Sequence, residues 1–153
     1  MKIKVEQPIT GSREKIWKVI TDIDNAANTI SAIDKIEVLN RPAKGLEGLK
    51  WRETRTLFGK TATEVMWITE AAENKYYKTR AESHGAVYTT NLSISGSGNS
   101  HVLSMEFESQ AQTFGGKLLA LIFGTLFRNA TKKAFIQDLQ DIKKAVEQEK
   151  VVS

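Results

Sequence analysis

The chain has 153 residues, of which 41% are hydrophobic and 26% charged, as expected for one globular domain. It has no cysteine and two histidines, which excludes a disulfide framework and a thiolate nucleophile and argues against a metal centre. The net charge of +4 comes from basic residues spread along the chain without an aromatic-basic motif. We therefore expect a single domain over residues 1–153, with no metal, no cofactor and no nucleic-acid partner.

The first forty residues predict a strand, two short helices and a second strand. Ile3, Val5 and Ile9 share one parity, which indicates a strand with one buried face. Residues 11–24 predict a helix with Ser12 as its N-cap, residues 25–32 a second short helix, and residues 33–40 a strand. The alternating start lacks the apolar core of a signal peptide, and we expect a cytoplasmic protein.

The middle of the chain predicts five more strands, over residues 49–58, 61–69, 76–83, 87–95 and 102–111. Gly59 and Lys60 fit the two central positions of a type II′ turn. Of the two histidines, His84 lies in a predicted turn, and His101 lies at a strand start, where we expect it to be exposed.

From about residue 116 to 148 the pattern becomes helical, because Phe135, Leu139, Ile142 and Val146 recur at four-three-four spacing. A helix of this length is ~45 Å long but only about 10 Å wide. Seven antiparallel strands form a strongly twisted sheet, whose concave face one such helix cannot fill. The sequence therefore predicts a cavity between sheet and helix.

Several segments resemble those of a known superfamily. They are "IWKVITD" at 16–22, "GLKWRETRTLFGKTATEVMWITE" at 48–70, "SHGAVY" at 83–88 and "DLQDIKKAVE" at 138–147. Together they are similar to the SRPBCC superfamily of START lipid-transfer and pollen-allergen domains, and to its bacterial polyketide cyclase/dehydrase-like branch. The resemblance covers nearly the whole chain. It implies an α+β helix-grip fold: a seven-stranded curved antiparallel sheet, two short helices between strands 1 and 2, and a long C-terminal helix over the concave face. It also implies a hydrophobic ligand between sheet and helix, and it supplies no shared catalytic set.

The charged residues of the hairpin at 51–70 are the candidates for a polar or catalytic site. With Gly59 and Lys60 in the turn, Arg55 faces Glu64, Glu53 faces Met66, and Trp51 faces Ile68. Residues opposite each other share a face, and we assign this face to the interior. Glu53, Arg55 and Glu64 are then a polar cluster on the cavity wall and the candidate catalytic residues. The other interpretation is a partly exposed ion pair near the end of the sheet.

The first half of the last helix is apolar on nearly all sides, which fits either core packing or an entrance for a lipid-like ligand. The basic residues that bracket it, among them Lys117 and Arg128, suggest transient contact with a membrane surface. Together with the inward face of the sheet, this segment completes the expected ligand-binding set. That set is Trp51, Glu53, Arg55, Glu64, Met66, Tyr88, Leu92, Phe107, Leu119, Ile122, Phe123 and Leu126.

Three functions fit these features. The first is non-catalytic binding of a hydrophobic or amphipathic small molecule, lipid-like or polycyclic. The second is a polyketide cyclase or dehydratase that uses the same cavity, and the third is a protein-interaction module built on the Phe-rich helix start. The sequence leaves open whether the protein is a monomer or a homodimer.

Overall fold

The computed structural model describes residues 1–57, 59–83 and 85–148, and within the last helix it describes side chains from Arg128 onward. The elements follow the predicted order. They are β1 (Lys2–Thr10), α1 (Arg13–Thr21), the 3-10 helix η1 (Ile23–Asn25), α2 (Ala26–Thr29), β2 (Ile33–Asn40), β3 (Lys50–Leu57), β4 (Lys60–Ala72), β5 (Tyr76–Ser83), β6 (Ala86–Ser97), β7 (Ser100–Ala111) and α3 (Phe114–Gln148).

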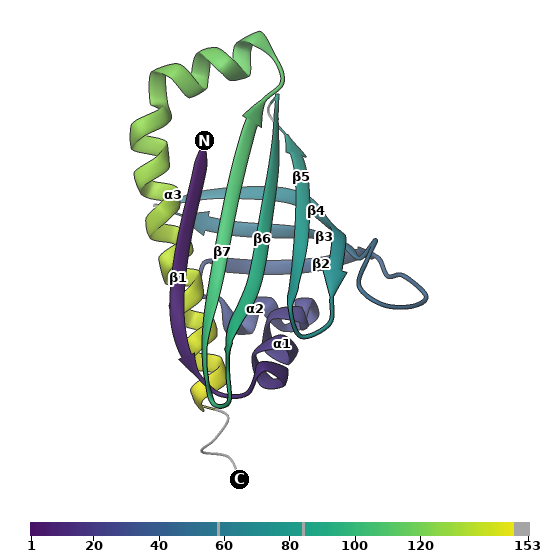
Figure 1. The fold of residues 1–153 in the computed structure, drawn as a ribbon. Helices are drawn as coiled ribbons and strands as arrows, with labels where there is room; N and C mark the ends of the chain where they lie inside the picture. The colour runs from purple at the N-terminus through teal and green to yellow at the C-terminus, as the bar shows by residue number, and fades with distance from the viewer. Residues whose placement is uncertain (58, 84, 149–153) are drawn as a thin grey trace.

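The strands form one antiparallel sheet in the order β1-β7-β6-β5-β4-β3-β2. The sheet curls so strongly that β2, β3 and β4 run crosswise behind β1, β7 and β6 (Figure 1). The long helix α3 crosses above the upper end of the sheet and then runs down beside β1, where it also packs on β7, α1 and α2 (Figure 1). This is the helix-grip fold that the sequence predicts.

Helix α1 closes one end of the curled sheet. Its N-cap Ser12 accepts a hydrogen bond from the backbone N–H of Lys15 (3.1 Å). The guanidinium of Arg13 donates to the carbonyls of Asn74, Ile94 and Gly96, each at 2.9 Å, and so ties the helix start to the neighbouring strand ends. At the other end of α1, the Tyr77 hydroxyl donates to the carbonyl of Ile20 (2.9 Å).

The packed core lies where α1 and the C-terminal half of α3 meet the sheet. Its most buried side chains are Ile9, Ile16, Ile68, Leu103, Leu139 and Val146. His101 belongs to the same region and is buried, with its Nδ1 2.8 Å from the carbonyl oxygen of Gly11. Our expectation of an exposed His101 is wrong because it shares the inward parity of Leu103 and Met105 on β7.

In the part of the chain that the structure describes, no helix is long and apolar enough to cross a membrane.

Candidate ligand-binding cavity

A cavity of about 1380 Å³ lies between the inner face of the sheet and the helices α1, α2 and α3. It exceeds the roughly 300–1,000 Å³ of typical small-molecule pockets. Apolar side chains from every layer line it, namely Val19, Ile20, Ile23, Ile30, Ile33, Leu57, Met66, Leu92, Met105, Phe107, Phe135 and Ile142.

The hairpin β3–β4 presents the face that we assigned to the interior. Trp51, Glu53, Arg55, Glu64 and Met66 all line the cavity. The predicted register is nevertheless wrong by two residues. Trp51 pairs with Met66 and Glu53 with Glu64, because Leu57 pairs with Lys60 and Lys60 already belongs to β4. A shift of two residues preserves the side-chain parity, so the face is right although the partners are not.

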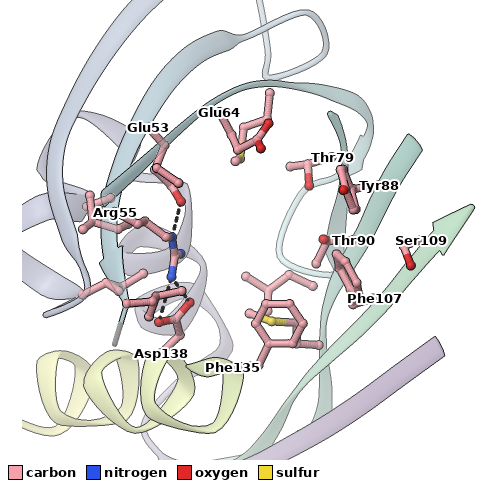
Figure 2. A pocket seen from close by; sticks show the side chains of 18 of the residues that line it. Glu53, Arg55, Glu64, Thr79, Tyr88, Thr90, Phe107, Ser109, Phe135 and Asp138 are labelled. Carbon is pink, nitrogen blue, oxygen red and sulfur yellow. Dashed lines mark hydrogen bonds and ion pairs between the residues drawn. The ribbon is translucent and has the colours of Figure 1, made fainter. Parts of the chain in front are cut away.

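Arg55 lies between two carboxylates on the cavity wall (Figure 2). Its Nε donates to Glu53 Oε2, and its Nη1 lies 2.9 Å and 3.2 Å from the two carboxylate oxygens of Asp138 on α3. The second oxygen of Glu53 accepts a hydrogen bond from Trp51 Nε1 (3.3 Å). The cluster therefore connects strand β3 of the sheet to the long helix α3.

The partner of Arg55 in α3 was missed from the sequence. We expected Glu64 in that role, but Glu64 lies away from Arg55 (Figure 2) and accepts a hydrogen bond from Ser83 Oγ (2.9 Å). One signal was present: Asp138 falls on the stripe of Phe135 and Ile142, three residues after the first and four before the second. A lone carboxylate on an apolar stripe requires a buried partner.

Burial and charge act in opposite directions on this cluster. Burial alone would lower the pKa of Arg55, but the two adjacent carboxylates raise it above its usual value, so the guanidinium stays charged. For Asp138, which is 1% exposed, burial is the largest effect, and it outweighs the attraction of Arg55. Burial, with the nearby Glu53 and Asp141 adding to it, raises the pKa of Asp138 to about 6.

A second polar group lies farther from Arg55 on the cavity wall, around Glu64 and Tyr88 (Figure 2). Burial and the charge of Glu64 raise the pKa of the Tyr88 hydroxyl, although a hydrogen bond with Ser83 lowers it in part. Tyr88 therefore stays protonated near neutral pH and can donate a hydrogen bond. Thr79, Thr90 and Ser109 add hydroxyl groups to this wall.

Three aromatic rings connect β6, β7 and α3 beside the cavity. Tyr88 stacks on Phe107 at 6.0 Å between ring centroids, and Phe107 packs on Phe135 at 5.1 Å. Leu92 is buried on the same inward parity of β6. Four further side chains that we expected in the site lie outside the described residues, namely those of Leu119, Ile122, Phe123 and Leu126. His84 also lies outside the described residues.

Metal ligands do not gather anywhere within the described ranges: no group of three or more His, Cys, Asp or Glu side chains is arranged to hold an ion.

The sequence matches a known protein family over nearly its whole length. A family model described as "polyketide cyclase / dehydrase and lipid transport" matches residues 1–147. The chain belongs to this family. No curated protein matches the sequence.

Solved structures show the same fold at low sequence identity. The protein TTHA0849 from Thermus thermophilus aligns with a TM-score of 0.81 and 11% identity over 97% of this chain and 99% of that one. A START superfamily protein from Mycobacterium smegmatis aligns with a TM-score of 0.77 and 16% identity, over 96% and 97% of the two chains. The Zhui aromatase/cyclase from a Streptomyces species, R1128, aligns with a TM-score of 0.74 and 12% identity, over 97% and 94%. This polyketide cyclase / dehydrase and lipid transport domain thus shares its architecture with both START and aromatase/cyclase proteins.

Protonation of Asp138 should leave a signature in stability. A carboxyl whose pKa is raised in the folded state stabilises the folded state. This stabilisation is complete at pH values below the ordinary pKa of 3.8, and it is lost as the pH rises through about 6. Relative to wild type, the unfolding free energy of Asp138→Asn should therefore rise by roughly 2 kcal/mol between pH 4 and pH 7. Urea denaturation at a series of pH values measures this, with Glu106→Gln on the exposed outer face as control. Parallel pH profiles for wild type and Asp138→Asn would contradict the assignment.

Removal of Arg55 should be costly because it leaves two buried carboxylates unpaired. We expect Arg55→Met to lower the unfolding free energy at pH 7.5 by about 3–5 kcal/mol. Adding Asp138→Asn to Arg55→Met should restore part of that loss, since one unpaired charge is removed. Urea denaturation of the two single variants and the double variant gives the coupling energy. A loss below about 1 kcal/mol for Arg55→Met, as for an exposed pair, would show that the cluster is solvated.

Proposed function

We propose that this protein binds an apolar or amphipathic small molecule in the cavity between its sheet and α3. The observation that carries the proposal is the cavity itself: about 1380 Å³, lined mainly by apolar side chains, beside a core of fully buried side chains. Well-packed interiors contain few voids larger than a water molecule. A space of this size is therefore better explained by a ligand than by loose packing.

The distribution of polar groups suits an amphipathic ligand. The polar side chains labelled in Figure 2 fall in two places, the Arg55 cluster and the wall around Tyr88, while apolar side chains make up most of the lining. Pockets of this kind bind mainly through apolar surface and use a few polar groups to orient the ligand. The family description, which names both lipid transport and polyketide cyclases, is consistent with such a ligand.

A fluorescent probe tests this proposal directly. N-phenyl-1-naphthylamine, which is uncharged and apolar, should bind the purified protein with saturation and with increased fluorescence. Thr90→Trp should weaken this binding at least about tenfold, because Thr90 lines the cavity and the larger indole fills part of it.

Thr89→Trp is the matched control, since Thr89 is the preceding residue of β6 and is exposed on the other face of the sheet. It should bind the probe like wild type. Equal binding by all three proteins would place the probe outside the cavity and remove the main support for the proposal.

The second candidate function is proton-transfer catalysis at the Arg55 cluster, as in a cyclase or dehydratase. The observation that favours it is the raised pKa of Asp138, about 6, which suits a general base near neutral pH. Among the structural neighbours are the Zhui aromatase/cyclase and a norcoclaurine synthase from Thalictrum flavum in complex with dopamine and hydroxybenzaldehyde. Asp138 is 1% exposed, so catalysis would require its ion pair with Arg55 to open.

Hydrogen–deuterium exchange of a simple ketone separates binding from catalysis. If Asp138 is a base, the protein should accelerate exchange of the methyl protons of 2-acetylnaphthalene in D₂O, as followed by proton NMR. Asp138→Asn should abolish the acceleration and leave N-phenyl-1-naphthylamine binding intact. An exchange rate equal to that of buffer would count against catalysis and leave the binding function standing.

The interaction-module hypothesis depended on Phe123 and its neighbours, whose side chains lie outside the described residues. It remains a prediction, as do membrane contact, cytoplasmic location and the choice between monomer and homodimer.

A further inference from the structure

The Arg55 cluster contains one positive and two negative side chains, and Arg55 is the member that a ligand can reach. The Arg55 side chain is 23% exposed, whereas those of Glu53 and Asp138 are 9% and 1% exposed. Its Nε and Nη1 are occupied by the carboxylates, while Nη2 has no hydrogen-bond partner among the described residues. The cavity therefore offers unpaired N–H donors of a guanidinium whose charge is already balanced.

The count of charges determines which acceptor suits these donors. With both carboxylates ionised, the cluster carries a net charge of −1, and both carboxylates are largely buried. A ligand carboxylate at Nη2 would meet Glu53 and Asp138 behind the guanidinium, and like charges in a desolvated site repel strongly. An uncharged oxygen would accept the same hydrogen bond without this cost. Lys2, Lys60 and Arg128 also line the cavity, but they are exposed and screened by water.

We infer that this cluster selects ligands with an uncharged oxygen acceptor, such as a ketone, ester or amide carbonyl, and rejects those with a carboxylate there. An arginine in an apolar cavity ordinarily suggests an anchor for an acid. Here Asp138 reverses that preference: it is a specificity-determining residue that acts through Arg55 without touching the ligand. The inference rests on the proposed binding function and adds the chemical class of the ligand to it.

A pair of nearly isosteric ligands tests the inference. 2-Acetylnaphthalene and 2-naphthoate share one ring system and differ by a methyl group in place of a carboxylate oxygen. Each is used at pH 7.5 to displace N-phenyl-1-naphthylamine from the full chain. Wild type should bind 2-acetylnaphthalene at least about tenfold more tightly than 2-naphthoate. In Asp138→Asn the affinity for 2-naphthoate should rise about tenfold, while that for 2-acetylnaphthalene changes less than about twofold.

Glu106→Gln is the charge-matched control. It removes one negative charge from the exposed outer face of β7 and should leave both affinities unchanged. Equal affinities of wild type for the two ligands, or an equal gain in Glu106→Gln and Asp138→Asn, would overturn the inference while the binding function stands. Failure of wild type to bind N-phenyl-1-naphthylamine at all would overturn both. Circular dichroism checks that Asp138→Asn is folded, which the comparison requires. If Asp138→Asn does not fold, Glu53→Gln removes the other carboxylate and should raise the affinity for 2-naphthoate in the same way.

Discussion

The ion pair between Arg55 and Asp138 connects two parts of the fold that otherwise stay apart. Helix α3 packs on β1, β7, α1 and α2, whereas β3 lies across the cavity from it. The two residues are 83 positions apart in the chain and meet at 2.9 Å. Buried ion pairs contribute little net stability because desolvation offsets their attraction. The effect of this pair is therefore geometric: it fixes the distance between sheet and helix while the space beside it stays open.

Several features of this arrangement could be predicted from local sequence patterns. Alternation along the strands indicates which side chains share a face, and that information survives an error in register. The inward face of β3 and β4 was thus predicted correctly with the wrong partners, since the pairing was off by two residues. The cavity followed from the number of strands and the single covering helix, because both are visible as periodicity.

What the sequence did not reveal depends on turn geometry and on long-range contacts. The register of the hairpin is set by where its turn begins, and Lys60 lies within β4 instead of in the turn. The identity of Asp138 as the partner of Arg55 depends on how far α3 descends beside the sheet, which no local pattern encodes. His101 was misplaced because β7 begins at Ser100, earlier than predicted, so that His101 lies within the strand on the inward parity of Leu103. Its ring is then close to Gly11, which follows β1. Only the position of Asp138 between Phe135 and Ile142 hinted at a buried partner.

The two polar walls of the cavity differ in what they can offer a ligand. Around Tyr88 the hydroxyl groups of Thr79, Thr90 and Ser109 can both donate and accept hydrogen bonds. Around Arg55 the most exposed group is the guanidinium, a donor, and the carboxylates that hold it also repel anions. Arg55 can be held in an apolar cavity only if a carboxylate neutralises its charge. Because two carboxylates contact Arg55, the cluster as a whole carries a net negative charge. The same pairing that stabilises the guanidinium in this position therefore limits the chemistry of any molecule that binds beside it.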